Sequence, residues 1–414
     1  MKNNNETVSN GQEVLTPYVL DVNVGNDNGN SEHDIIINGK QICSPNVLAK
    51  VRKVPMLDEV NKDYVAEHIE DNLIVTVDSP SATPGVYYIG NYALGSREKV
   101  RSIEVGADNN KVDSEIAIIN TLSQIAGFAV QEIYKKDNKI EQGIFVNVFM
   151  STALPISQYN KNEADRFSDK FMKHKHKITV NVGILRVDVT INFKFVKVIP
   201  EGVTAVHAVH SLDEIMSDNK DKFDVLSFDG IEKPVDSRYF KNKKILHIGI
   251  GEGTTELPIT NDIVFDPNFI KGINNGIGHA IDRSLDEFKK ELGLKDYSRQ
   301  KYSEVLKDES HKFYPVASDI ISTYIDDEAE EILHAAKTEI QKANNEIDLI
   351  MVYGGGSISM RNQLENKLKS VCERGNIDLF YVPEKYAVIL ESIGLYKFTT
   401  GKIFEALAKN HNNR

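Results

Sequence analysis

The first half of the chain combines the two-residue period of strands with the 3.6-residue period of helices. Apolar and polar residues alternate over 18–24, which predicts a strand, and a second strand is predicted at 34–37 after the turn-rich segment 25–30. Residues 114–131 place apolar side chains at helical spacing, and 144–150 is a short apolar run typical of a strand. We therefore expect a glycine-containing turn between two strands, followed by a helix and another strand.

The middle of the chain continues with a β-rich pattern. Residues 177–182, 185–191 and 193–199 predict three strands of a β-meander. Pro200-Glu201-Gly202 then predicts the start of a helix over 203–212, where an acidic residue would interact favourably with the helix dipole.

The second half repeats the order strand, glycine turn, strand and helix. A buried-type strand at 244–250 is followed by a glycine turn, a partner strand at 255–259 and a helix over 272–292. A strand at 347–353 ends in three glycines before a helix over 361–372. The repeated device indicates an internal duplication with a period too long for a solenoid. We predict an α/β fold of two lobes that face each other across a cleft.

Small residues concentrate at three strand ends, in segments 25–31, 249–255 and 354–357. Backbone amides approach an anion closely only where no Cβ intervenes, so such turns are suited to cradle phosphate. A tight hairpin also needs glycine for its positive φ, so one turn alone does not identify a phosphate site. Neither a Walker-type G-x-x-x-x-G-K-[ST] sequence nor a G-x-G-x-x-G sequence after the first strand is present.

Six segments, taken together, resemble motifs of the ATPase superfamily that contains actin, heat-shock chaperones and sugar kinases. Three of them resemble its two phosphate hairpins and its adenosine motif, and these are VNVGN (22–26), IGIGEGTTE (248–256) and VYGGGS (352–357). The others resemble its second connecting helix and two strand ends of plasmid-segregating actins of the ParM type, and these are GINNG (272–276), KVIPEGVTA (197–205) and MSTALP (150–155). The resemblance covers roughly residues 15–400.

This resemblance implies a duplicated actin and ribonuclease-H-like fold with a nucleotide cleft between two lobes. The boundaries it implies are a flexible tail at 1–14, a first lobe at 15–205 with a smaller insert at about 45–110, a second lobe at 206–394 with a helical insert at about 280–345, and a C-terminal helix at about 395–414 that packs back on the first lobe.

The same resemblance implies that ATP or GTP binds with Mg²⁺ between the lobes. The phosphate-binding residues it implies are Gly25, Asn26, Asp27, Asn28, Gly251, Glu252, Gly253, Thr254 and Thr255. The nucleoside-binding residues it implies are Gly276, Lys307, Gly354, Gly355, Gly356 and Ser357. Glu201 would be the catalytic residue, because a carboxylate can accept a hydrogen bond from water and orient it toward the γ-phosphate. The alternative for Glu201 is an ordinary acidic residue at a helix start.

The sequence departs from the family pattern where magnesium is oriented. The first hairpin of the family carries an aspartate two residues before its glycine, where this chain has Asn23, and the second begins with an aspartate, where this chain has Gly249. Asn30 stands where a lysine is expected. Asp21, on the same strand face as residue 23, and Glu252 are therefore the predicted metal residues, holding Mg²⁺ through water.

Charge and composition narrow the expected partners. The chain has 61 acidic and 49 basic residues and a net charge of −12, which argues against direct general nucleic-acid binding, because phosphate binding needs a basic face. The lysine-rich stretch 170–177 could touch DNA or a partner, although such a stretch is more often a solvated loop. Two cysteines, Cys43 and Cys372, fit a reducing compartment. No run approaches the roughly 20 apolar residues of a membrane span, so we expect a cytoplasmic protein.

By resemblance, the predicted function is a nucleotide-dependent filament that hydrolyses ATP or GTP and segregates plasmid DNA through a DNA-binding adaptor protein. Other copies of the chain would then be its main partner. One alternative is a metabolic small-molecule kinase of the same fold, for which Asp113 is an available first-lobe aspartate, although a helix cap explains this residue better. The other alternative is a non-polymerising scaffold or chaperone, but the chain lacks the additional large substrate domain of such chaperones.

Overall fold

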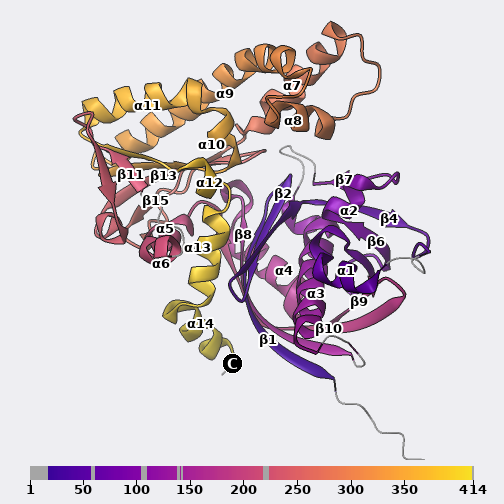
Figure 1. The fold of residues 1–414 in the computed structure, drawn as a ribbon. Helices are drawn as coiled ribbons and strands as arrows, with labels where there is room; N and C mark the ends of the chain where they lie inside the picture. The colour runs from indigo at the N-terminus through magenta and orange to yellow at the C-terminus, as the bar shows by residue number, and fades with distance from the viewer. Residues whose placement is uncertain are drawn as a thin grey trace, which may run out of the picture.

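The computed structural model contains two sheets with flanking helices, which form two lobes (Figure 1). This architecture confirms the expected α/β class. The tail expected at 1–14 lies outside the described residues. The structure describes residues 17–56, 61–103, 110–137, 140, 143–217 and 223–412.

The first lobe is built on a ten-stranded sheet with the strand order β3-β2-β1-β8-β10-β9-β5-β6-β4-β7. Strands β1, β8 and β10 are parallel, and β2 pairs antiparallel with β1 on the other side. The strands are β1 (Tyr18–Asn28), β2 (Glu32–Ile37), β3 (Lys40–Pro45), β4 (Val47–Val51), β5 (Ile74–Asp78), β6 (Gly85–Ile89), β7 (Arg101–Ser102), β8 (Ile144–Leu154), β9 (His176–Val182) and β10 (Leu185–Pro200).

Strand β10 corrects the predicted meander, because one strand of 16 residues replaces the two expected at 185–191 and 193–199. Its pairing with β8 continues through a register shift between Phe193 and Phe195. A bulge adds one residue to one strand, so the alternation of buried and exposed side chains changes phase there while the strand continues. The phase change looks like a strand end in the sequence.

The second lobe is built on a nine-stranded sheet with the order β12-β11-β19-β18-β13-β14-β17, and β15 and β16 branch from β13. Strands β13, β18 and β19 are parallel, and β14 pairs antiparallel with β13. The strands are β11 (Phe223–Leu226), β12 (Glu232–Val235), β13 (Lys244–Ile250), β14 (Thr255–Glu256), β15 (Ile259–Asn261), β16 (Val264–Phe265), β17 (Gly272–Ile273), β18 (Leu349–Tyr353) and β19 (Asp378–Tyr381).

The two sheets share a core arrangement. In each lobe one strand, β1 or β13, forms an antiparallel hairpin with the next strand on one side and begins a run of three parallel strands on the other, β1-β8-β10 or β13-β18-β19. This arrangement supports the duplication that the repeated glycine turns indicate.

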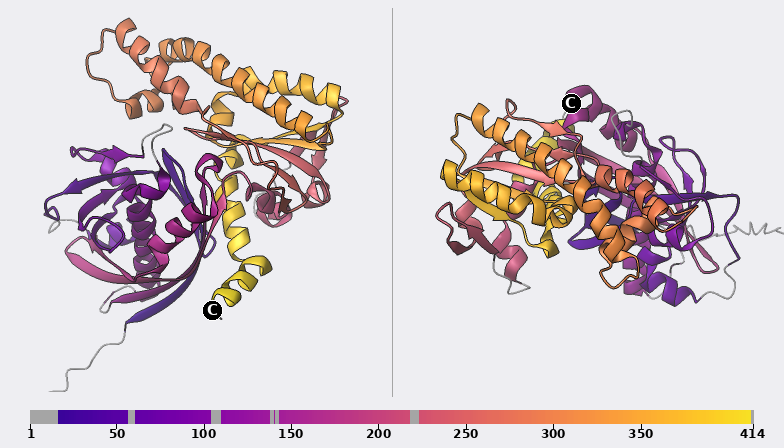
Figure 2. Two further views of the ribbon diagram at one scale, coloured as in Figure 1. Left: turned by 180° about the vertical axis from the view of Figure 1, so that it is seen from behind. Right: turned by 90° about the horizontal axis from the view of Figure 1, so that it is seen from above.

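Helices cover both sheets, and they include a short 3₁₀ turn, η2 (Lys111–Asp113), before α3. In the second lobe α9 and α11 lie on one face of the sheet and α5 on the other (Figures 1 and 2). The α-helices are α1 (Lys62–Glu67), α2 (Gly90–Gly95), α3 (Glu115–Asp137), α4 (Lys161–Met172), α5 (Ala205–Val209), α6 (Leu212–Ser217), α7 (Ile277–Glu291), α8 (Arg299–Lys307), α9 (Tyr314–Lys342), α10 (Gly355–Ser359), α11 (Arg361–Gly375), α12 (Glu384–Ala387), α13 (Leu390–Thr399) and α14 (Lys402–Asn412).

Helix α3 is the core helix of the first lobe and contacts β1, β2, β4, β9 and β10. It is long and apolar enough to cross a membrane by length and composition, but 94% of its 18-residue apolar window is buried inside the fold. Sheet strands and loops cover its apolar residues, which explains its composition without a bilayer.

Two predicted helices begin later in the structure. The helix expected at 272–292 is α7, because Gly272 and Ile273 belong to β17 and Gly276 precedes the first turn. The helix expected at 203–212 consists of two short helices, α5 and α6. Gly202 adopts a φ of +84°, a left-handed conformation that keeps the helix from extending back beyond α5. Glu201 therefore lies in a turn and not at a helix start.

Helix α13 lies between the lobes and contacts β1 and β8 of the first sheet as well as α5 (Figure 1). The backbone of α13 is in close contact with β1 of the first sheet and with the turn before α5. A Cβ added at Gly25 of β1 would lie 2.3 Å from the Tyr396 nitrogen, and one added at Gly394 would lie 2.0 Å from the Thr204 oxygen. Helix α14 then packs on β10, where the Phe404 and Phe195 ring centroids lie 5.1 Å apart.

Candidate functional site: a cavity between two glycine hairpins

A cavity of about 670 Å³ lies between the lobes, at the carboxyl ends of their parallel strands. Pro155 follows β8, Glu201 follows β10, Ile250 ends β13 and Tyr353 ends β18, and all four residues line it. Carboxyl ends of parallel strands are where α/β sheets bind ligands, because loops from several strands converge there. The volume is in the range of about 300–1,000 Å³ that is typical of small-molecule sites.

The structure brings most, but not all, of the predicted site residues to this cavity. Those that line it are Asp27, Glu201, Gly251, Glu252, Gly253, Thr254, Lys307, Gly354, Gly355 and Gly356. Those that are not among its described lining residues are Asp21, Gly25, Asn26, Asn28, Thr255, Gly276 and Ser357.

The turn of the first hairpin lies further along the chain than the sequence analysis placed it. Gly25 is covered by α13, and Asn26 is buried, where its amide donates to Thr152 Oγ1 at 3.1 Å. The β1–β2 pairing continues to Asn28 opposite His33, so the hairpin turns around Gly29. Asp27 stands two residues before Gly29, which is the spacing that the family pattern requires. The predicted turn at Gly25 is therefore corrected to a turn at Gly29, four residues further along the chain.

Asp27 and Asp34 lie opposite each other in the β1–β2 pairing, and both line the cavity. Burial raises the pKa of the Asp27 carboxyl to about 7, while Lys111 lowers it and Glu201 raises it. Burial also raises the pKa of Asp34 to about 7. The Asp34 Oδ1 atom has no hydrogen-bond partner among the described residues. This side of the cavity therefore carries two buried carboxyl groups whose pKa values are raised by burial.

The second hairpin forms a tight turn over the start of α7. The Gly251 amide donates to the Thr254 oxygen at 2.9 Å, and the Gly278 amide donates to the Glu252 oxygen at 2.7 Å. The Glu252 carboxylate is paired with Arg299 of α8 and is mostly buried. Thr255 is buried and donates to the Asn275 oxygen, so it supports the turn from behind.

The two predicted metal residues are not brought together. Asp21 is exposed near the start of β1, where it accepts a hydrogen bond from Asn147 at 2.8 Å and lines a separate hollow with Lys194. The Glu252 carboxylate lies in the cavity but is engaged by Arg299. Asp27 is the aspartate of β1 that reaches the cavity.

The third glycine turn packs directly on the second hairpin. Gly354 has a φ of +92°, and a Cβ at this position would lie 2.3 Å from the Ile250 oxygen. Only glycine permits this conformation and this contact without strain. The Ser357 hydroxyl is buried and donates to the Gly354 oxygen at 2.8 Å, which closes the first turn of α10.

Glu201 lines the cavity and pairs with a buried lysine, Lys111, that no sequence motif indicated and that is not among the described lining residues. The Glu201 amide donates to the Leu154 oxygen at 2.8 Å, which fixes the turn against the end of β8. Its carboxylate accepts from Lys111 Nζ at 2.8 Å, and the Lys111 side chain is only 3% exposed. Lys111 comes from η2, about 90 residues away in sequence, so only the folded chain shows the pair.

Two further buried glutamates lie beside this pair. Glu256 is 3% exposed, its Oε2 accepts from the Ile156 amide at 3.3 Å, and its Oε1 has no partner among the described residues. Burial, and then Glu201, raise its pKa. Glu391 of α13 accepts from the Tyr353 hydroxyl at 3.1 Å and from the Thr204 hydroxyl, and burial raises its pKa to about 8.

The end of the cavity near α7, α8 and α9 is lined by apolar side chains together with a few polar and charged ones. Lys307 lies at its mouth and pairs with Glu32 of the first lobe at 2.9 Å, with both side chains largely exposed. This pair bridges the lobes. The apolar side chains that line this end are Ile277, Ile281, Leu306, Ile321 and Ile325.

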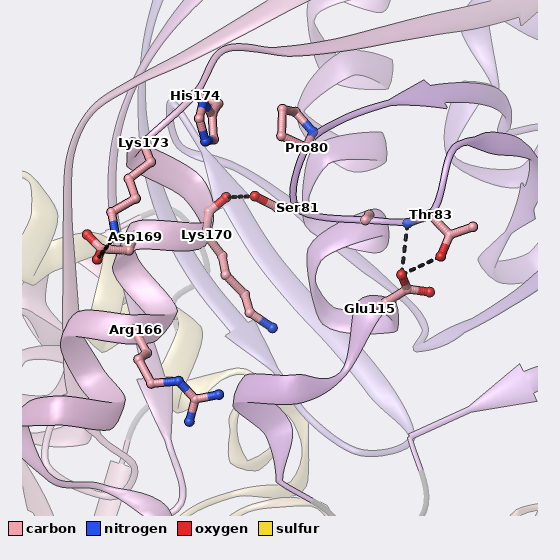
Figure 3. A pocket seen from close by; sticks show the side chains of 10 residues that line it. Pro80, Ser81, Thr83, Glu115, Arg166, Asp169, Lys170, Lys173 and His174 are labelled. Atoms are coloured by element: carbon pink, nitrogen blue, oxygen red, sulfur yellow. Dashed lines mark hydrogen bonds and ion pairs between the residues drawn. The ribbon is translucent and has the colours of Figure 1, made fainter.

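A second hollow of about 580 Å³ lies on the surface of the first lobe (Figure 3). Lys173 pairs with Asp169 at 2.8 Å, and Thr83 donates to Glu115 through its amide and its hydroxyl. Arg166 pairs with Asp113, the aspartate considered for a kinase, and their side chains are 50% and 59% exposed. Asp113 is thus a surface ion-pair residue and is not among the described residues that line the cavity between the lobes.

Comparison with known proteins agrees with this geometry. The model of the N-terminal domain of actin-like proteins matches residues 25–203, and a search of the curated proteins found no match. The crystal structure of the actin-like protein Alp7A is similar with a TM-score of 0.65 and 16% identity, over 95% of this chain and 100% of that chain.

Two other solved structures show the same likeness. Ta0583, an archaeal actin homolog, has a TM-score of 0.60 and 14% identity, over 91% of this chain and 98% of its own. ParM of Bacillus thuringiensis with ATP has a TM-score of 0.57 and 17% identity, over 93% of this chain and 99% of that chain. Residues 25–203 therefore match the N-terminal domain of actin-like proteins, and the chain as a whole has the two-lobed fold seen in Alp7A, Ta0583 and ParM.

Proposed function

We propose that the cavity binds a purine nucleoside triphosphate, that the protein hydrolyses it, and that the bound nucleotide controls assembly of the chain into filaments. The observation that carries the proposal is the convergence of the Gly29 turn, the Gly251–Thr254 turn and Glu201 on one cavity. Among the similar structures, ParM of Bacillus thuringiensis is described with ATP and with ADP, and Ta0583 in complex with ADP.

The phosphates would lie between the two hairpins, where Gly29, Gly251 and Gly253 expose backbone to the cavity. Amide groups in such turns bind anions without adding a full charge. The nucleoside would extend along Gly354–Gly356 toward the apolar end, because a base needs apolar contact over its faces. Lys307 stands at that end, where its ion pair with Glu32 closes the mouth.

The residues of the cavity also fit Mg²⁺. Carboxylates next to a polyphosphate repel it unless a cation lies between them, and Asp34 Oδ1 and Glu256 Oε1 are buried oxygens without partners among the described residues. Asp27 is the first-lobe residue that would hold the ion, through water because Mg²⁺ keeps several of its waters. Bound Mg²⁺ neutralises charge on the β- and γ-phosphates.

Glu201 would accept a hydrogen bond from the attacking water and orient it. Lys111 holds the carboxylate in place from the buried side. Glu201→Ala should slow phosphate release on the order of 100-fold while nucleotide binding and assembly persist. Glu384→Ala, at an exposed position of the same cavity, is the matched control. Unchanged phosphate release in Glu201→Ala would remove Glu201 from the mechanism.

Assembly is proposed because the chain shares its fold with ParM, one solved form of which is described as a non-polymerisable mutant. A head-to-tail contact between copies that does not close into a ring generates a filament. Loss of the γ-phosphate would remove bonds that bridge the two hairpins and so shift the balance between open and closed lobes. The role we propose is plasmid segregation, with DNA reached through an adaptor because the chain is acidic.

Pelleting of the protein with ATP and with GTP, side by side and with Mg²⁺, tests the proposal. We expect nucleotide-dependent pelleting above a threshold concentration, with one nucleotide more effective. Nucleotide binding without pelleting at any concentration would favour the alternative of a non-polymerising scaffold or chaperone. Phosphate transfer to a sugar or carboxylic acid, in place of phosphate release, would favour the kinase.

A further inference from the structure

The end of β13 offers no carboxylate to the cavity, although it lies beside the phosphate turn. Gly249, which has no side chain, is the residue of β13 at this place. A Cβ added to Gly249 would lie 3.1–3.2 Å from atoms of the Tyr353 side chain. The ring therefore fills the space that a side chain at residue 249 would use. The Tyr353 hydroxyl reaches past Gly249 and donates to the Gly202 oxygen at 2.9 Å and to Glu391 at 3.1 Å.

Glu391 presents a carboxylate to the same part of the cavity from a different element, α13. The Tyr353 hydroxyl donates to one of its oxygens and the Thr204 hydroxyl to the other. These two hydroxyl groups hold the carboxyl group in place and lower its pKa, against the burial that raises it to about 8, and each oxygen keeps a lone pair for a further partner.

The surroundings of Glu391 contain more negative than positive groups. Asp27, Glu201 and Glu256 interact electrostatically with one another or with Glu391. Lys111 is paired with Glu201 and also lowers the pKa of Asp27, whereas Glu256 and Glu391 form no ion pair among the described residues. Buried charges in proteins are paired or coordinate metals. The buried, unpartnered Glu256 Oε1 independently indicates that a group is missing from this place.

We propose that Glu391 is a cation-holding carboxylate of this protein, and that it acts together with Asp27 on the divalent ion that accompanies the nucleotide. The proposal rests on the proposed nucleotide-binding function. Glu391 takes the place of a side chain that Gly249 lacks, and Glu256 accepts from the water shell of the ion. The first lobe then supplies Asp27, and the helix between the lobes supplies Glu391.

The test measures how strongly Mg²⁺ and nucleotide binding reinforce each other. The affinity for ADP is measured by titration calorimetry with Mg²⁺ and with EDTA, in the wild type, in Glu391→Gln and in Glu384→Gln. Glutamine keeps the shape of the side chain and can still accept from Tyr353 or Thr204, so the fold should persist. Glu384 lines the same cavity at an exposed position, so it controls for the loss of one negative charge.

We expect Mg²⁺ to strengthen ADP binding in the wild type and in Glu384→Gln. In Glu391→Gln this gain should fall on the order of tenfold or more, while binding in EDTA is unchanged or stronger because a negative charge near the phosphates is removed. Retention of ADP binding in EDTA also shows that the variant is folded. A parallel measurement replaces Mg²⁺ with Mn²⁺ and follows bound Mn²⁺ by electron paramagnetic resonance.

An Mg²⁺ gain in Glu391→Gln equal to that of the wild type would overturn the inference. So would an equal loss in Glu391→Gln and Glu384→Gln, because it would show a general charge effect. If the wild type binds neither ADP nor ATP under any condition, the proposed function itself fails, and the two failures are thereby distinguished.

Discussion

At the residue scale, the cavity is defined by carboxyl groups whose environments differ. Glu201 is paired with Lys111, Glu252 with Arg299, and Glu391 with two hydroxyl groups. Asp27 and Glu256 form no ion pair among the described residues. The identity of a side chain alone did not distinguish these roles, which depend on contacts between elements far apart in sequence.

The buried pair of Lys111 and Glu201 should contribute to stability as well as to the site. Lys111→Met would leave the Glu201 carboxylate beside Asp27 without its cation, and we expect a loss of about 1–3 kcal/mol in the free energy of unfolding. Lys177→Met removes an exposed pair with Asp188 at 3.0 Å and should cost less than about 1 kcal/mol. Urea unfolding of both variants checks the difference, and equal losses would contradict it.

His247 of β13 should make stability depend on pH. Its ring is buried, Nε2 pairs with Thr260 Oγ1 at 2.9 Å, and burial lowers the pKa of His247 to about 3. The ordinary pKa of histidine is about 6.5, so its stabilising effect is complete above pH 6.5 and is lost as the pH falls toward 3. Between pH 6.5 and pH 5 the loss is about 2 kcal/mol.

Urea unfolding of His247→Gln at pH 7 and pH 5 checks this expectation. The variant should lose less stability than the wild type on acidification. His334→Gln, at an exposed position of α9, is the matched control. Parallel pH dependence in the wild type and His247→Gln would show that the buried ring does not carry the effect.

At the element scale, the sequence predicted the long central strands β1, β8, β13 and β18, because each has its own alternation or apolar run. It split β10, where a bulge between Phe193 and Phe195 changes the phase, and it extended α7 backward over β17. It also assigned the first phosphate turn to Gly25 and not to Gly29. Local patterns contain no signal for α13 covering Gly25, since that contact joins opposite ends of the chain.

The close fit of α13 makes Gly394 sensitive to substitution. In Gly394→Ala the new methyl group would lie 2.0 Å from the Thr204 oxygen, so helix and turn must separate. We expect a loss of about 1–3 kcal/mol or more in the free energy of unfolding, and weaker nucleotide binding because Thr204 supports Glu391.

Gly95→Ala is the matched control for this prediction, because Gly95 ends a helix and has nothing within 4 Å of an added Cβ. Thermal unfolding should leave this variant close to the wild type. A Gly394→Ala protein as stable as the control would show that α13 can shift without cost.

At the scale of the whole molecule, the contacts between the lobes include α13, the hydrogen bond from the Ile156 amide to Glu256, and the ion pair of Lys307 and Glu32. Lys307→Glu would place two negative charges opposite each other and favour open lobes. We expect several-fold weaker nucleotide binding at low salt, a smaller effect at high salt because exposed charges are screened, and unchanged unfolding stability. Lys301→Glu, exposed on the same helix, is the control for charge, and equal weakening in both variants would contradict the prediction.

The backbone contacts of α13 also restrict how the molecule can deform. Neither Gly25 nor Gly394 leaves room for the helix to slide against the first lobe or against the turn before α5. The lobes can still rotate relative to each other about an axis near this helix. Because α14 and the cavity lie at opposite ends of α13, a small rotation that narrows one end of the molecule should widen the other.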